Sequence, residues 1–142
     1  MKAKKITLKE NTVLCREGDL EKDIYLVISG RLLICSRSGK RVTPIAYIGE
    51  NEYFGEMSFL DNKPRSADVV AIESTELLQI PPEALKEQLP KWLLFTMRQM
   101  TQRIRSMDEV IRDRGIKRQN VDTIKPLSID EQRVLFDIID QG

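Results

Sequence analysis

The chain has 142 residues, of which 41% are hydrophobic and 32% are charged, and its formal net charge is +1. This length and composition predict one globular domain with a sizeable core, and no apolar run approaches the roughly 20 residues that cross a bilayer. The charge balance is not the strongly basic one of a dedicated nucleic-acid binder. Histidine is absent, so the commonest general base and histidine-based metal sites are excluded, and we expect neither a metal nor an enzyme.

The N-terminal segment MKAKKITLKEN carries lysines but no apolar segment behind them, so it does not have the pattern of a secretory signal. We therefore expect a cytoplasmic protein with no membrane association. Cys15 and Cys35 lie in apolar, strand-like runs, where reduced thiols behave as small hydrophobic side chains. Two cysteines make a poor disulfide framework for a chain of this size, so both are predicted to be inert core residues.

From Ile6 to about Pro81 the sequence consists of short β-rich runs separated by turn residues. The runs are TVLC, DIYLVISG, RLLICS, RVTPIAYIG, SADVVAIE and TELLQIP. Their spacing predicts an antiparallel sandwich or barrel. We expect DIYLVISGRLLIC to form two strands about a tight turn at Ser29-Gly30. In the first strand the residues on both faces are largely apolar, which predicts that the strand is well buried.

After Pro82 the apolar spacing changes from two to three and four. The segment PEALKEQLP predicts a short helix with a proline at its start. No glycine or proline interrupts the chain from Lys91 to about Arg112, which predicts a long helix. Its apolar residues form a heptad seam made of Leu93, Met97, Met100, Ile104, Met107 and Ile111.

The seam can join two copies of the chain or lie on the sheet of its own domain. Both can hold together, because Trp92, Phe95 and Val110 lie beside the seam and widen the apolar surface. We expect a homodimer through the helix from Leu93 to Ile111.

Beyond the long helix, residues 113–127 are charged and unperiodic, and they predict a connector with a helix stop at Gly115. SIDEQRVLFDIID then opens with Ser128 and Glu131 at the spacing of a capping box, which predicts a C-terminal amphipathic helix. The chain therefore divides into a domain at 1–112 that includes the long helix, a connector at 113–127 and a helix within 128–142.

The stretch YFGEMSFLDNKPRSADVVA contains the residues best suited to binding a ligand. Gly55 lets the backbone come close to a ligand, and a brief helix beginning there would direct free amide N–H groups at an anion. Arg65 offers a fixed fork of donors suited to a phosphate, and Glu56 offers an acceptor for a sugar hydroxyl. Together they predict a site for a phosphorylated sugar. The alternative is an exposed turn with a surface ion pair between Glu56 and Arg65.

This stretch resembles the phosphate-binding cassette of the cyclic nucleotide-binding domain family. In that cassette a strand, FGE, a short helix, PR, a small residue and an alanine embrace the cyclic phosphate and ribose. REGD, DIYLVISGRL, YIGENEYFGE and two helices after the strands also follow the family order, over residues 10–112. The resemblance implies a mostly β fold with some α: a double-stranded β-helix, or jelly-roll-like β-roll, with a short cassette helix and C-terminal lid and dimer helices.

The resemblance also implies a role for each cassette residue. Glu56 would accept a hydrogen bond from the ribose 2′-hydroxyl, Arg65 would hold the cyclic phosphate, and the hydroxyl of Ser66 would donate to the phosphate. The other expected cassette contacts, through backbone proximity or N–H groups, are Gly55, Met57, Ser58 and Ala67.

In the family the long helix is a lid that covers the base, and QMTQRI at residues 99–104 is similar to the lid helix of bacterial members. On that alignment Met107 and Asp108 fall where base contacts are made. Asp108 could accept from the 6-amino group of adenine and would repel the 6-oxygen of guanine. Position 66 is not the threonine frequent in cyclic GMP-selective relatives. Cyclic AMP is therefore expected over cyclic GMP, unless Asp108 belongs to a solvated face.

Bacterial transcription regulators of the family continue into a helix-turn-helix domain, whereas this chain stops at Gly142 after one further helix. No DNA binding is therefore expected of this chain alone. We expect a regulatory sensor that transmits ligand binding through its C-terminal helices to an unknown downstream protein. The alternative is the sensor part of a DNA-binding regulator whose helix-turn-helix is absent here. Metal-dependent cupins, which are enzymes with a similar fold, are a third alternative. Their sites depend on histidines, and this chain has none.

Overall fold

The structure is a computed structural model that describes the backbone of residues 2–114 and 125–141 and the side chains of residues 2–107 and 125–141. The strands are β1 (Lys4–Leu8), β2 (Thr12–Cys15), β3 (Ile24–Ser29), β4 (Leu32–Ser38), β5 (Arg41–Ile48), β6 (Tyr53–Phe54), β7 (Asp68–Ala71) and β8 (Thr75–Ile80). The helices are α1 (Glu56–Asp61), α2 (Pro82–Lys86), α3 (Lys91–Arg114) and α4 (Ile129–Asp140).

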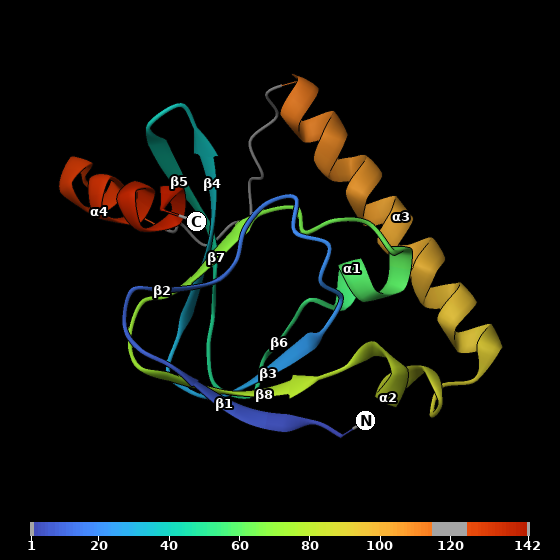
Figure 1. Cartoon of the computed structure of the whole chain (residues 1–142). Helices are drawn as coiled ribbons and strands as arrows, with labels where there is room; N and C mark the ends of the chain where they lie inside the picture. Colours follow the sequence, from blue (N-terminus) through green and yellow to red (C-terminus); the bar gives the residue numbers. More distant parts are fainter. Residues whose placement is uncertain (1, 115–124, 142) are drawn as a thin grey trace.

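The strands form two antiparallel sheets with the orders β1-β8-β3-β6 and β2-β7-β4-β5 (Figure 1). Apolar side chains from both sheets meet in the main core, which contains Cys15, Tyr25, Val27, Leu32, Ile48, Val69, Ala71 and Leu77. This arrangement confirms the expected mostly β fold of the jelly-roll-like β-roll type. Ile24, Tyr25 and Val27 are all buried, which confirms that β3 is well covered.

The chain turns at Gly30, as expected, but β3 and β4 do not pair with each other in the described structure. β3 pairs with β6 and β8, whereas β4 pairs with β5 and β7. Gly30 has a φ of +92°, and a Cβ there would lie 2.5 Å from the carbonyl oxygen of Ser74. The turn is therefore a corner between the two sheets and not a hairpin, and only glycine fits it.

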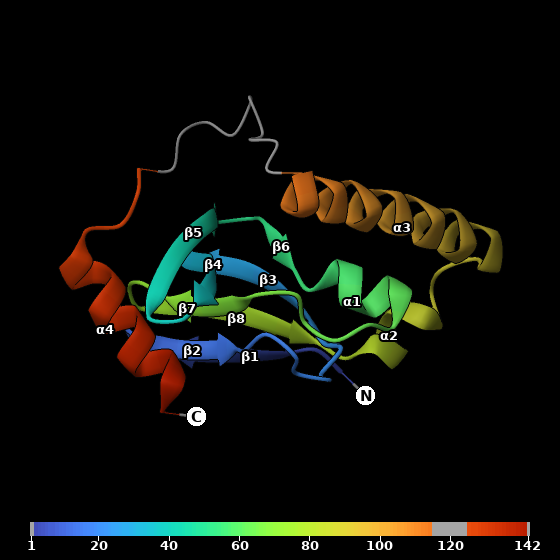
Figure 2. The same ribbon diagram turned by 90° about the horizontal axis from the view of Figure 1, so that it is seen from above.

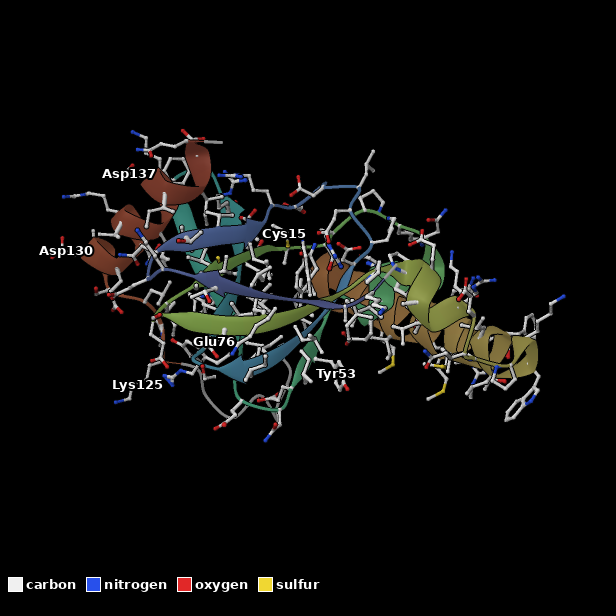
Figure 3. All side chains as sticks on the ribbon, turned by 60° about the horizontal axis from the view of Figure 1, so that its bottom comes forward. Cys15, Tyr53, Glu76, Lys125, Asp130 and Asp137 are labelled. Atoms are coloured by element: carbon white, nitrogen blue, oxygen red, sulfur yellow. The ribbon has the colours of Figure 1, made fainter. Side chains whose placement is uncertain are left out.

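Both cysteines are free and buried, which confirms that they are core residues. Cys15 lies within the roll (Figure 3) and is 2% exposed, and Cys35 is 0% exposed. Burial raises the pKa of Cys15 to about 12, against a smaller opposing effect of Arg65. Burial, and after it the charge of Asp68, raises the pKa of Cys35 to about 12. Neither thiol is ionised near neutral pH.

α1 lies between the roll and α3 (Figure 1). A second apolar cluster fills this space, formed by Ile24, Phe59 and Leu60 with Leu94 and Met97 of α3 among the residues around it. The long helix therefore does lie on its own domain, although on the cassette helix and not on a sheet. No helix in the described part of the chain is long and apolar enough to span a membrane.

The heptad seam is divided by this packing. Met97 is half-buried against the domain, whereas Met100 is 56%, Ile104 is 46% and Met107 is 64% exposed. Ile111 is outside the residues whose side chains are described. Trp92 and Phe95 are also exposed. α3 thus uses one face within the domain and leaves an apolar face uncovered.

α4 lies at the end of the molecule opposite α3, against the outer face of the sheet β2-β7-β4-β5 (Figure 2). Ser128 begins it with the predicted capping box, because its hydroxyl accepts from the Glu131 N–H at 3.1 Å and its own N–H donates to the Glu131 carboxylate at 3.0 Å. The Ser128 N–H also holds the pKa of Glu131 below its usual value. A third apolar cluster joins α4 to the sheet and contains Leu127, Leu135 and Ile139 with Leu33, Cys35, Val42 and Val70.

Candidate functional site

The turn from β6 into α1 brings the backbone close to an arginine. Gly55 has a φ of +97°, and a Cβ there would lie 2.7 Å from Nη1 of Arg65 and from the carbonyl oxygen of Asp23. Only glycine can therefore occupy this position without a shift of its neighbours. The first helical bond of α1 runs from the Phe59 N–H to the Gly55 carbonyl, so the preceding amides of the first turn have no partner within the helix.

Arg65 is the central charged group of the site, although it is only 3% exposed. Its Nη2 donates to the carbonyl oxygen of Asp23 at 2.6 Å and to a carboxylate oxygen of Glu21 at 3.2 Å. Its Nη1 donates to the carbonyl oxygen of Gly55 at 3.3 Å. The guanidinium carbon lies 5.2 Å from the centre of the Phe54 ring, within the range of a cation–π contact. The side chain is thus fixed on several sides.

The remaining donor of Arg65 has no partner in the described part of the chain. Its Nε is buried and has no hydrogen bond to any of the described residues. Buried polar groups are almost always satisfied, and an unmet donor costs roughly 1–3 kcal/mol. An acceptor from outside the chain would satisfy this donor. The surface ion pair between Glu56 and Arg65 is wrong as a description of the site, because Arg65 is buried and its carboxylate partner is Glu21.

A single cavity collects the cassette residues. It encloses about 130 Å³, which is less than the roughly 300–1,000 Å³ of pockets that bury a whole small ligand. The seven cassette residues predicted from the sequence all line it: Gly55, Glu56, Met57, Ser58, Arg65, Ser66 and Ala67. The rest of the wall consists of Ile34, Ile48, Tyr53 and Phe54. A ligand larger than a sugar phosphate would extend out of this cavity.

An acidic network behind Arg65 was not predicted from the sequence. The Tyr25 hydroxyl donates to Glu21 at 2.7 Å, and the Gln79 amide donates to the carboxylate of Asp23. Burial, followed by the hydrogen bond to Glu21, raises the pKa of Tyr25, so its hydroxyl remains a donor. The only sequence signal was the pair of acids between REGD and the next strand. The partner of these acids, Arg65, is 44 residues from Glu21 in the sequence.

Of the two predicted base contacts on α3, only Met107 has a described side chain, and it is not brought to the cavity. Met107 is exposed and does not line it, and the side chain of Asp108 is outside those that the structure describes. α3 reaches the cassette helix instead, because Arg98 Nε donates to the Leu60 carbonyl at 2.8 Å and Arg105 pairs with Asp61. Among the described residues, no three His, Cys, Asp or Glu side chains are grouped so that they could hold a metal ion.

Comparison with known proteins gives the site its context. The cyclic nucleotide-binding domain family matches residues 5–91, more than half of the chain. The cyclic AMP receptor protein of Thermus thermophilus is 45% identical over 78 residues, which are 52% of this chain and 36% of that protein. The chain therefore corresponds to about a third of the length of that relative.

Two solved structures share the fold. The cAMP-bound EAL enzyme Bd1971 has a TM-score of 0.68 at 30% identity, over 74% of this chain and 29% of that one. The catabolite activator protein of Thermus thermophilus has a TM-score of 0.62 at 29% identity, over 80% of this chain and 54% of that one. Since the family match includes the whole cassette and nearly all of both sheets, the chain belongs to the cyclic nucleotide-binding domain family.

Proposed function

We propose that this regulatory domain binds cyclic AMP in preference to cyclic GMP, with the cyclic phosphate on Arg65. The observation that carries the proposal is a buried guanidinium in the wall of the cassette cavity, whose Nε has no partner among the residues that the structure describes. A cyclic phosphate carries a single negative charge and several acceptor oxygens, which suit a planar fork of donors. The proposed role of the site is regulatory, because the groups that line the cavity are suited to holding a ligand.

The other cassette residues complete the proposed contacts. Glu56 is exposed at the start of α1, where its carboxylate can accept from the ribose 2′-hydroxyl. The Ser66 hydroxyl and the unpaired amides of the first turn of α1 supply further donors to the phosphate. Glu21 neutralises Arg65 in the structure, and the phosphate would share or replace that contact.

The base is proposed to lie outside the small cavity, under the C-terminal half of α3. Structures of the EAL enzyme Bd1971 exist in cAMP-bound and cGMP-bound forms, so a sugar-phosphate site of this type need not choose between the bases in that protein. Selection would therefore come from residues that meet the base. We assign this role to Met107 and Asp108, with Asp108 accepting from the 6-amino group of adenine.

We also propose that two copies of the chain associate through α3 and that the C-terminal helices transmit the signal. The uncovered face with Met100, Ile104 and Met107 supports this association, since an apolar stripe at heptad spacing is suited to a second helix. Contact of α3 with the last residues of α1 supports its role in transmission. The same proposal includes a cytoplasmic location and an unknown downstream protein. It also divides the chain into a domain at 1–112, a connector at 113–127 and a C-terminal helix within 128–142.

Titration calorimetry of Arg65→Ala tests the phosphate site. Removing one member of such a charge pair costs about 2–5 kcal/mol, which lowers the affinity for cyclic AMP roughly thirty-fold to several thousand-fold. Glu56→Ala should cost less, about 1.5–3 kcal/mol, because it removes one hydrogen bond to a charged acceptor. Arg41→Ala, an exposed arginine outside the cavity, is the control. The same titrations with cyclic GMP test the base preference.

Thermal melting establishes that each variant is folded before its affinity is compared. Arg65→Lys serves as a second variant, because it keeps the charge but loses the fork of donors, and it should bind more weakly than wild type. A folded Arg65→Ala protein that binds cyclic AMP within about three-fold of wild type, less than 1 kcal/mol, would overturn the phosphate assignment.

A further inference from the structure

One short loop touches both the cassette arginine and the C-terminal helix. The loop comprises residues 16–19 and follows β2. Its Gly18 N–H donates to the Arg65 carbonyl at 2.9 Å, and the Arg65 N–H donates to its Asp19 carbonyl at 2.8 Å. On the other side, Arg16 Nε donates to the Ile139 carbonyl of α4 at 2.8 Å. The 16–19 loop is therefore held by the backbone of Arg65 and holds the end of α4.

Asp68 makes a second connection between the same two places. It lies three residues after Arg65, is 0% exposed, and accepts from the Glu17 N–H of the loop at 2.9 Å. Its carboxylate also pairs with Arg37 at 2.7 Å, and Nη1 of Arg37 lies 3.9 Å from the carboxylate of Asp140. Two arginines thus meet the last turn of α4, where free carbonyls and the helix dipole favour cations.

The other contacts of α4 are independent of the loop. Leu135 and Ile139 pack on the outer face of the sheet. Gln132, in the first turn of the helix, accepts from the Val42 N–H of β5 at 3.0 Å. The helix can therefore be loosened from the roll at a point that has no bond to the cassette, which provides a matched control.

We propose that cyclic nucleotide binding and docking of α4 on the roll are coupled through the 16–19 loop and Asp68, so that an occupied site stabilises the docked helix. This inference rests on the proposed function. A ligand that holds Arg65 also restricts the backbone to which Gly18 and Asp19 are bonded. That restriction fixes the position from which Arg16 reaches α4. Coupling of binding equilibria is reciprocal, so docked α4 raises the affinity for the ligand by the same factor.

Hydrogen exchange of the full chain with and without saturating cyclic AMP tests the coupling. In wild type, cyclic AMP should slow exchange at residues 129–140 about five-fold or more, equal to about 1 kcal/mol. α2, which has no bond to the 16–19 loop, reports the general stabilisation and should change less. In Arg16→Ala the slowing at α4 should be clearly reduced, because only the connection through Asp68 and Arg37 remains, while the cassette at residues 54–71 remains protected. In Gln132→Ala α4 should exchange faster at the outset but keep its response.

Arg16→Lys keeps a donor and a charge at the end of α4, so it should retain part of the response of α4 to cyclic AMP. This variant replaces Arg16→Ala in the test if Arg16→Ala does not fold. Protection of residues 54–71 with unchanged exchange at 129–140 in wild type overturns the coupling and leaves the proposed function standing. Loss of the α4 response in Gln132→Ala to the same extent as in Arg16→Ala also overturns it. Absence of any cyclic AMP binding overturns both.

Discussion

Arg105 of α3 pairs with Asp61, the last residue of α1, and leaves that carboxylate only 2% exposed. Nη2 of Arg105 donates to the second carboxylate oxygen at 3.2 Å, so the contact is bidentate. About two turns earlier, Arg98 donates to the carbonyl of Leu60. α1 carries the cassette residues at its other end. These two arginines therefore connect the long helix to the element that begins at the ligand cavity.

We predict that Arg105→Gln loosens this connection. The substitution leaves the Asp61 carboxylate without its charge partner, and breaking a buried pair costs roughly 3–5 kcal/mol. We expect about 2–4 kcal/mol from urea unfolding, because water can reach the pair once the arginine is shortened. Arg103→Gln on the exposed side of the same helix should cost less than about 0.5 kcal/mol. Equal effects of the two variants would contradict a role for the pair.

Local sequence patterns were sufficient for much of the fold. Gly55 and the capping box of Ser128 depend on residues within a few positions, and both were predicted correctly. The cassette residues from 55 to 58 and from 65 to 67 also meet in one cavity as expected. Short-range geometry decides these features, so the order of residue types carries the information.

The charge partners could not be predicted in the same way. Arg65 pairs with Glu21, 44 residues earlier, although Glu56 is much nearer in the sequence. Arg105 and Asp61 are also 44 residues apart. Such pairs depend on how elements dock in three dimensions. The position of α4 was missed for the same reason, since its apolar stripe fits any covering surface.

Glu21→Gln should strengthen binding of cyclic AMP. Glu21 accepts from Arg65 at 3.2 Å and from the Tyr25 hydroxyl at 2.7 Å. The amide oxygen of glutamine can keep one of these contacts, while the negative charge that opposes the phosphate is lost. We expect a gain of about three- to ten-fold in affinity by calorimetry, equal to roughly 0.6–1.4 kcal/mol. Glu17→Gln, an exposed acid of the neighbouring loop, should change affinity less. Weaker binding would show that Glu21 acts mainly by holding Arg65 in place.

Lysines in the uncovered seam should produce a monomer. Met100 and Ile104 are 56% and 46% exposed on the described face of α3, and two charges there would oppose a second copy of the helix. Sedimentation of Met100→Lys/Ile104→Lys should show half the mass of wild type. Gln99→Lys/Gln102→Lys adds the same charge at exposed positions outside the seam and should remain a dimer. A wild-type chain that is already monomeric at high micromolar concentration would end the dimer proposal.

The buried thiols should make the protein sensitive to alkaline pH. Burial holds the pKa of Cys15 and Cys35 at about 12 in the folded chain, whereas an exposed thiol titrates near about 8.5. Because the folded values are raised, this stabilising contribution is complete below about pH 8.5 and is lost as the pH rises toward 12. At about pH 10 each thiol should lower the free energy of unfolding by about 2 kcal/mol.

Urea unfolding at about pH 7.5 and pH 10 measures this loss, with Cys15→Ala/Cys35→Ala as the reference. The alanine protein is less stable at both values because each substitution leaves a small cavity, but the thiol contribution to its pH dependence is gone. Tyrosine and lysine titrations are common to both proteins and cancel in the comparison. Wild type should therefore lose about 4 kcal/mol more than the variant between the two pH values. Parallel losses in the two proteins would show that the thiols ionise in the folded chain as readily as in the unfolded one.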